Sequence, residues 1–319
     1  MIIFMVRRLL QAVAVVLLVT VITFILLRLI PGNPAIAIMG PSAYRNPAAI
    51  AQFDRVYGFN KPWYGQYWLW LDHLLHGNLG YSWNLNQSVA SLLSTHLPKT
   101  VFLVGISIIL ALLIAIPIGV VQAVRRNKIV DHFFNGFSTI FYAMPAFLLG
   151  ILLILVFAIK FPIFPPEGPQ GESVGAIFSN FNALILPIIT LTLITIALFS
   201  RYMRSSVLDN LTEDYVRTAK AKGASERRVL LKHVLRNSLI PIATLLGLLL
   251  PALFAGALIT ESVFNYPGMG YLFYQQALKQ DYPTLLGITV VVAVATVIGS
   301  LLADIAYAVL DPRVRYVSQ

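Results

Sequence analysis

The chain has 319 residues, of which 58% are hydrophobic and only 11% are charged, and its mean hydropathy is +0.79. Soluble domains carry about 25% charged residues, so a water-soluble body of this size is excluded and the sequence predicts an integral membrane protein. The net charge of +10 lies at the ends of apolar segments. Membrane topology and binding to anionic lipid explain positive charge at these positions, so the charge does not indicate a nucleic-acid partner. The absence of cysteine excludes disulfides, thiolate nucleophiles and cysteine-ligated metals.

Six uncharged runs are long enough to cross a bilayer, which takes about 20 apolar residues as a helix. The fourth run is longer than one span needs, so its helix is expected to start near Ala183. The predicted fold is therefore an all-α membrane protein with six transmembrane helices. The runs are 9–27, 100–124, 133–159, 173–200, 237–260 and 282–303.

Positive charge is distributed unevenly between the two sides of this predicted bundle. Sixteen Lys and Arg residues fall on one side and seven on the other. The richer side is expected to be cytoplasmic, so both termini are predicted to lie in the cytoplasm. The first run follows two arginines, as a signal peptide does. Its nineteen uncharged residues exceed a signal core of about 7–15 and no A-x-A site follows, so we expect a retained helix. The richer side holds Arg7, Arg8, Arg313, Arg315 and the loops 125–128 and 201–236.

The segment 31–98, between the first two spans, is predicted to lie outside and contains all four tryptophans. Trp and Tyr favour the membrane interface, where the ring is partly apolar and its polar atom stays wet. An interfacial belt is one interpretation, and an aromatic platform for a partner or substrate is the other. The aromatic residues are Trp63, Tyr64, Tyr67, Trp68, Trp70, Tyr81 and Trp83.

The polar segment 207–238 is predicted to form two short helices on the cytoplasmic side. Thr212 is expected to cap the first helix, and Asp214 in its first turn suits the helix dipole. Gly223 is expected just past its end, because glycine accepts a positive φ. Ser225 is then expected to cap a second helix.

That second helix carries a basic stripe, because Arg228, Lys232 and Arg236 recur every four residues. With apolar residues on another face and Pro241 turning the chain, it predicts an amphipathic elbow along the membrane surface. The simpler interpretation is a loop that only sets membrane topology, with its Lys and Arg side chains reaching toward lipid phosphates. The helix–glycine–helix pattern and the small side chains of 218–221 favour a docking surface for a cytoplasmic partner. The apolar residues are Leu230, Leu231, Val234 and Leu235.

The run DYVRTAKAKG, from Asp214 to Gly223, with its continuation to Pro241, resembles the EAA coupling loop of ABC importer permeases. The dipeptide/oligopeptide and nickel group matches best. The general motif begins Glu-Ala-Ala where this chain has Arg217-Thr218-Ala219, and Pro241 lies farther from the glycine. The peptide group shares both features. Supporting matches are Arg28–Pro34, Gly77–Gly80, Thr260–Gly270, Asp281–Pro283 and Leu310–Arg313.

The resemblance implies the type I ABC importer permease (MetI-like) fold, in a multi-pass protein of a prokaryotic cytoplasmic (inner) membrane. We divide the chain into residues 1–98, the first span with the aromatic-rich external segment, and residues 99–319, a five-helix permease core whose coupling loop covers about 207–238. The implied partners are a second homologous permease in a heterodimer, two ABC ATPases and an extracellular or periplasmic substrate-binding protein. ATP and Mg²⁺ would be bound by the ATPases, and this chain is expected to bind no cofactor or metal.

By the same resemblance, the first short helix would sit in a cleft of one ATPase. The chain itself would be the permease subunit that moves short peptides by alternating access. The substrate path is not assigned to residues. The expected ATPase-coupling residues are Asp214, Tyr215, Arg217, Thr218, Ala219, Lys220, Ala221, Lys222, Gly223, Ser225, Glu226 and Arg227.

Other function classes have weaker support. The chain has no G-x-x-x-x-G-K-[ST] loop and no histidine well inside an apolar span, so we expect no enzyme and no catalytic residue. An ion-driven secondary transporter would need ionisable groups at mid-membrane, and the candidates Arg28, Glu261 and Asp304 lie near span ends. A permease for nickel or another non-peptide solute is the second alternative.

Overall fold

The computed structural model describes residues 2–40, 45–171 and 173–310, with side chains described from residue 10 to residue 302 within those ranges. Arg313 and Arg315 lie outside the described residues. The side chains of Arg7, Arg8 and Asp304 lie outside the described side chains. The topology and ion-transport predictions that use these five residues therefore stay predictions.

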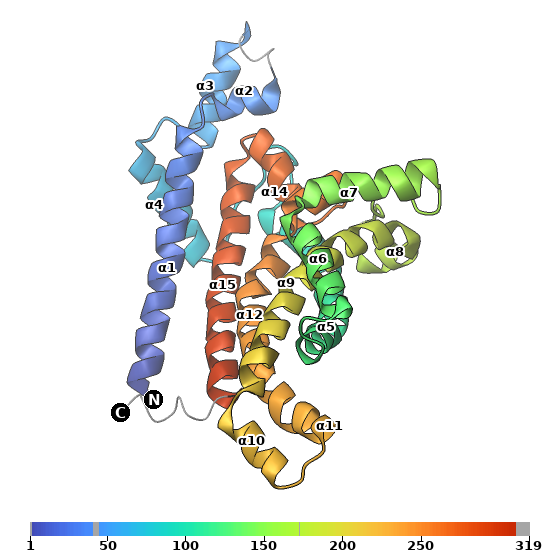
Figure 1. Ribbon diagram of the computed structural model, residues 1–319. Coiled ribbons are helices and arrows are strands. Elements are labelled where there is room, and N and C mark those ends of the chain that lie inside the picture. Colours follow the sequence, from blue (N-terminus) through green and yellow to red (C-terminus); the bar gives the residue numbers. More distant parts are fainter. Residues whose placement is uncertain (1, 41–44, 172, 311–319) are drawn as a thin grey trace.

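The described residues form helices joined by turns and loops, with one isolated β-bridge between Tyr81 and Ser88. Most helices form an elongated bundle (Figure 1). In chain order the elements are α1 (Ile2–Leu29), α2 (Pro34–Met39), α3 (Pro47–Val56), α4 (Trp63–Leu75), α5 (Val89–Val124), α6 (Ile129–Ala143), α7 (Ala146–Ile154), the π-helical turn η2 (Leu155–Lys160), α8 (Val174–Phe178), the 3₁₀ turn η3 (Phe181–Leu184), α9 (Ile185–Leu211), α10 (Asp214–Ala221), α11 (Glu226–Arg228), the π-helical turn η4 (Val229–Val234), α12 (Leu235–Ala255), α13 (Leu258–Val263), α14 (Met269–Leu278) and α15 (Tyr282–Leu310).

The predicted spans are present as five long helical stretches and one bent pair. The long stretches of the described chain are Leu10–Leu29, Val89–Val124, Phe181–Leu211, Glu226–Val263 and Tyr282–Leu302. The bent pair joins α6 to the helix formed by α7 and η2, and the two axes differ by 102°. The prediction of six spans holds when this pair counts as one.

The predicted span over 133–159 is bent, because the chain breaks between α6 and α7. Met144 adopts φ −77° and ψ 125°, the extended backbone that a residue before proline prefers. Pro145 follows with φ −59° and has no N–H to continue the α6 hydrogen-bond ladder. The third span therefore turns sharply instead of crossing as a rod.

The second span begins earlier than predicted, at Val89 rather than near residue 100. The side chain of Ser88 accepts a hydrogen bond from the Ser91 N–H at 3.2 Å and caps the helix. The helix then continues through Pro98, which lies inside it. Apolar packing of Leu92 and Leu93 outweighs the one backbone bond lost at the proline.

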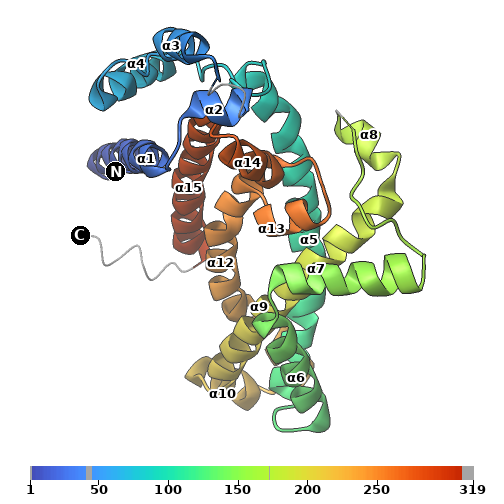
Figure 2. The ribbon, with the colours of Figure 1, turned by 90° about the horizontal axis from the view of Figure 1, so that it is seen from above.

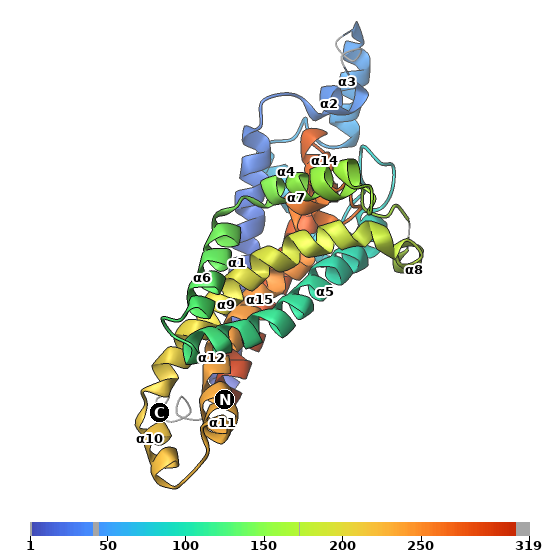
Figure 3. The same cartoon turned by 45° about the vertical axis from the view of Figure 1, so that its right-hand side comes forward.

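Helices α5 and α9 run side by side and form the centre of the bundle (Figure 3). Their contact is close because Gly119 of α5 lies against Met203 of α9. A Cβ at Gly119 would come 2.6 Å from the Met203 Cβ. On the other flank α12 packs along α15, and α1 lies against α15 at the edge (Figure 2).

A buried carboxylate organises the end of the bundle opposite α10. Glu261 of α13 accepts hydrogen bonds from the Thr100 hydroxyl at 2.9 Å, the Tyr271 N–H at 3.0 Å and the Ala257 N–H at 3.3 Å. The Thr100 hydroxyl oxygen in turn accepts from the Met269 N–H at 2.7 Å. Glu261 is fully buried and hydrogen-bonded, so its role is to join α5, α13 and α14.

A second buried contact fixes the loop that follows α13. The Tyr266 hydroxyl donates to the Lys99 carbonyl at 2.9 Å, and the Tyr266 ring is fully buried beside Leu103 of α5. Burial, reinforced by the charge of Glu261, raises the pKa of Tyr266. The phenol therefore stays a neutral donor at physiological pH.

Helix α4 lies beside the first span instead of beyond its end (Figure 1). The Tyr67 hydroxyl and the Thr20 hydroxyl are 3.0 Å apart, and the Tyr67 ring meets the Phe24 ring edge-on at 5.4 Å between centroids. Thr20 precedes Leu29, the end of α1, by nine residues, which is about 13 Å of helix. The contact shows that α4 packs along α1, and the interfacial belt and the partner platform both stay predictions. Trp68 of the same helix is exposed.

Candidate functional site

The predicted coupling loop projects from one end of the bundle (Figures 1 and 3). It consists of α10, a short turn, and α11, which continues through η4 into α12. The first turns of α1 and the last turns of α15 lie at the same end of the molecule (Figure 1). The first turns of α1 and the last turns of α15 thus lie on the same side of the bundle as the basic loop.

The end of α10 has the hydrogen-bond pattern of a Schellman motif. The Gly223 N–H donates to the Lys220 carbonyl at 2.9 Å, and the Ala224 N–H donates to the Ala219 carbonyl at 3.1 Å. Gly223 has φ +79°, the left-handed conformation that favours glycine. The predicted role of Gly223 at the helix end is confirmed.

The start of α10 differs from the prediction. Thr212 is the C-cap residue of α9. Its hydroxyl donates to the Asp209 carbonyl at 2.8 Å instead of capping α10. Glu213 occupies the N-cap position of α10 without a side-chain bond. Only these two residues separate the helices, and the Tyr215 hydroxyl donates to Oδ1 of Asn210 at 2.7 Å. Helix α10 is therefore tied directly to the end of α9.

One apolar residue anchors α10 to the bundle. Val216 is buried in a cluster with Met203 and Val207 of α9 and with Val229 and Val234 of η4. Sequence reasoning did not select it, although it is the only aliphatic side chain larger than alanine in α10. The remaining predicted coupling residues leave an outward face: Tyr215 and Ala219 are half-buried, and the exposed ones are Asp214, Arg217, Thr218, Lys220, Ala221, Lys222, Gly223, Ser225, Glu226 and Arg227.

The second predicted helix does not end as a surface elbow, and this prediction is wrong. Ser225 precedes α11 as expected but makes no side-chain cap hydrogen bond. The helix then continues without a break, and Pro241 lies inside α12. Burial of Val234 and Ser238, whose hydroxyl donates to the Ser206 carbonyl at 3.3 Å, holds this stretch against α9. Tertiary packing thus keeps the helix continuous despite the proline.

A groove of about 550 Å³ lies between α10 and the stretch formed by α11 and η4. The predicted basic stripe of Arg228, Lys232 and Arg236 is exposed, and its first two residues border this groove. Three of the lining residues are positively charged, Lys222, Arg228 and Lys232, so the groove suits a partner surface that carries acidic groups. The lining residues are Tyr215, Thr218, Ala219, Lys222, Gly223, Ala224, Arg228, Lys232 and His233.

No group of three or more His, Asp or Glu residues within the described part of the chain could hold a metal ion. The outward face of α10 also lacks a buried polar cluster. Its one ion pair, between Arg217 and Asp214 at 3.4 Å, has both side chains largely exposed. Such a surface can bind a protein partner but does not arrange groups for covalent chemistry.

Comparison with known proteins decides the family. Residues 115–316 match the family model of the binding-protein-dependent transport system inner membrane component, and residues 1–104 match the model of the N-terminal part of such membrane components. The chain belongs to this family. The all-α bundle described above is accordingly the MetI-like permease fold of a multi-pass membrane protein.

Individual relatives match nearly the whole chain. The oligopeptide transport system permease protein AppB of Bacillus subtilis is 39% identical over 315 residues, covering 98% of this chain and 99% of the relative. The oligopeptide transport system permease protein OppB of Haemophilus influenzae is 35% identical over 314 residues, with the same coverage. The glutathione transport system permease protein GsiC of Salmonella typhimurium is 34% identical over 313 residues, again covering 98% and 99%.

Proposed function

We propose that this chain is the permease subunit of an ATP-driven importer that carries short peptides across the cytoplasmic membrane. The family match and the relatives support the transport role. The names of those relatives refer to oligopeptides and to glutathione, itself a tripeptide. They favour a peptide over nickel or another non-peptide solute. An ion-driven carrier is not favoured, because Glu261 is fully engaged in structural hydrogen bonds.

The observation that carries the coupling proposal is the rigid attachment of α10. Two residues join it to α9, Val216 is buried under it, and the Schellman turn leads directly into the helix that continues as α12. A force applied to α10 therefore reaches two membrane spans without passing through a flexible linker. Closure of partner ATPases would move α9 and α12 together, as alternating access by rigid-body motion requires.

The proposed assembly also contains a second homologous permease, two ATPases that bind ATP and Mg²⁺, and a substrate-binding protein on the outer face. The basic groove and the exposed face of α10 form the proposed ATPase contact. Both chain termini and the α10 end would then be cytoplasmic. This chain supplies the path and the mechanical connection, and its partners supply the ATP hydrolysis.

Two alanine-to-tryptophan variants test this proposal. Ala221 is exposed on α10, and Ala90 is exposed in the first turn of α5, at the opposite end of the bundle. We expect Ala221→Trp to prevent co-purification of the ATPase subunits or to reduce ATP-dependent peptide uptake at least about tenfold, which corresponds to about 1.4 kcal/mol of docking energy. Ala90→Trp should keep the ATPases bound. Normal assembly and uptake with Ala221→Trp would refute docking on α10.

A further inference from the structure

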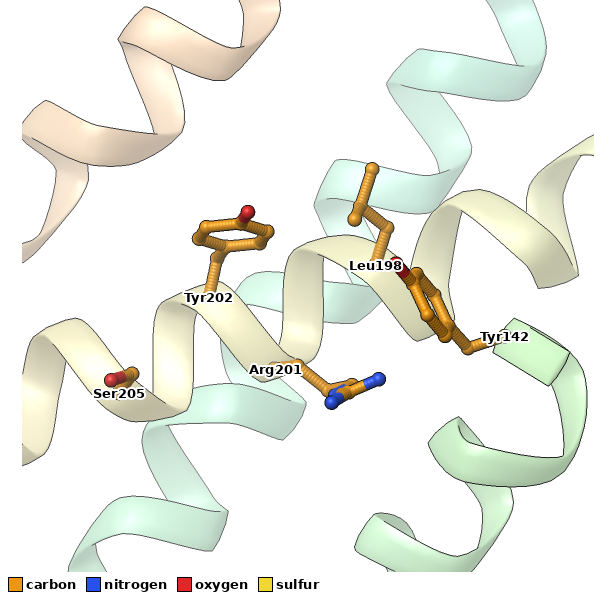
Figure 4. Close-up of a pocket in the computed structure, with 5 residues that line it drawn as sticks. All are labelled: Tyr142, Leu198, Arg201, Tyr202 and Ser205. Atoms are coloured by element: carbon orange, nitrogen blue, oxygen red, sulfur yellow. The ribbon is translucent and has the colours of Figure 1, made fainter.

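A polar pocket of about 280 Å³ lies between α6 and α9, away from the coupling loop (Figure 4). Tyr142 of α6 forms one side. Leu198, Arg201, Tyr202 and Ser205 form the other, and their spacing places them on one stripe of α9. The three polar members of that stripe are exposed in this chain. Leu198 lies in the uncharged run of α9 that ends at Ser200, and the three polar members follow that run directly, within the candidate span Phe181–Leu211.

Arg201 differs from the other arginine of this helix. Arg204, three residues on, binds Asp131 with both ends of its guanidinium, at 2.7 Å and 2.8 Å. Within the described part of the chain no carboxylate pairs with Arg201. Its guanidinium carbon instead lies 4.7 Å from the centroid of the Tyr142 ring. Helix α9 thus carries two cations about one turn apart, one neutralised and one open to a ligand.

The direction of the Arg201 side chain argues against a lipid ligand. Asp131, which binds Arg204, is in the first turn of α6, whereas Tyr142, which stacks on Arg201, is at its far end, eleven residues later. That separation is about 16 Å along the helix. A lipid-facing arginine turns toward the nearest headgroups, but this guanidinium extends along α6 away from its first turn. Arg201 directly follows the uncharged run that ends at Ser200. An unpaired cation that turns away from the headgroups at the end of a span typically faces an aqueous path or another protein surface.

We propose that Arg201, framed by Tyr142 and Tyr202, is a binding site for the side-chain carboxylates of acidic peptides on their way through the membrane. A guanidinium fork binds a carboxylate through two parallel charge-assisted hydrogen bonds. The Tyr142 ring lies 4.7 Å from the guanidinium carbon, and Tyr142 and Tyr202 line the same pocket. This inference rests on the proposed function, because it assigns a step in the passage of the same peptides.

The test uses the complete transporter in proteoliposomes, with ATP enclosed and the binding protein outside. Uptake of alanyl-glutamyl-alanine is compared with uptake of its neutral isostere alanyl-glutaminyl-alanine for Arg201→Gln and Arg201→Lys. Lys160→Gln is the control, since Lys160 is also an exposed cation over an aromatic ring, 5.4 Å from the Phe161 centroid, but lies at the end of its helix.

Arg201→Gln removes a charge-assisted contact to the Glu peptide, so we expect uptake of the Glu peptide to fall about tenfold. Uptake of the Gln peptide should fall less than about twofold. Arg201→Lys should retain only part of the preference, because lysine keeps the charge but not the two-bond fork. Lys160→Gln should change neither rate. Equal loss for both peptides, unchanged uptake of both, or release of the second permease would each overturn the carboxylate site. If wild-type protein takes up neither peptide with ATP, the proposed function fails first and this inference fails with it.

Discussion

Replacing Gly223 tests whether the shape of the α10 end, rather than its charge, matters for coupling. Gly223 has φ +79°, and a Cβ built there would meet no atom within 4 Å. Gly223→Ala therefore strains only the backbone, and a left-handed L-residue costs roughly 1–2 kcal/mol. That energy opens the Schellman turn about 5–30 times more often. We expect the Ala224 N–H to exchange with solvent faster by this factor and ATP-dependent uptake to fall with it.

The chain contains a matched control at the end of α4. Gly77 has φ +78° with no atom within 4 Å of a Cβ, and its turn has the same two bonds, Gly77 N–H to Leu74 and Asn78 N–H to His73. Gly77→Ala should raise local exchange equally but leave uptake unchanged. Gly223→Asn should restore part of the uptake, because asparagine tolerates a positive φ. Wild-type uptake by Gly223→Ala, despite faster exchange, would refute the argument.

Three further predictions concern the bundle. Asp131→Asn should destabilise the protein in detergent by about 2–3 kcal/mol, because Arg204 loses a charge-assisted acceptor; an unchanged thermal midpoint would contradict this. Glu261→Gln should cost about 1–3 kcal/mol, since an amide nitrogen replaces one oxygen that accepts a hydrogen bond, and equal stability of variant and wild type would exclude the proposed structural role. A protein whose single tryptophan is Trp68 should be quenched by brominated acyl chains more strongly than one that retains the half-buried Trp83. Equal quenching would place α4 outside the lipid.

The features that sequence reasoning predicted correctly are those set by local chemistry. The apolar runs predicted the spans because the bilayer fixes their length. Gly223 was predicted at the end of α10 because few other residues adopt its backbone conformation. The same logic failed at Thr212. Its hydroxyl could accept from an N–H of α10 or donate to a carbonyl of α9, and it donates to the Asp209 carbonyl.

The features that the sequence could not predict depend on tertiary contacts. Pro241 signals a break, but the packing of Ser238 against α9 keeps the helix continuous. The place of α4 beside α1 follows from the Tyr67–Thr20 contact, between residues 47 positions apart. Arg201 was counted only as one of the topogenic charges. Its isolation became visible once the structure showed that Asp131 is bound by Arg204.

The central claim is that α10 is a cytoplasmic docking helix, and cysteine cross-linking tests it most directly. The natural chain has no cysteine, so a single Thr218→Cys substitution on the exposed face of α10 gives one unique site. We expect this cysteine to cross-link to an ATPase subunit in the intact transporter and to resist a membrane-impermeant maleimide added outside the cell. Labelling from outside, or a cysteine that remains fully reactive and cross-links to no subunit in the assembled complex, would contradict the account.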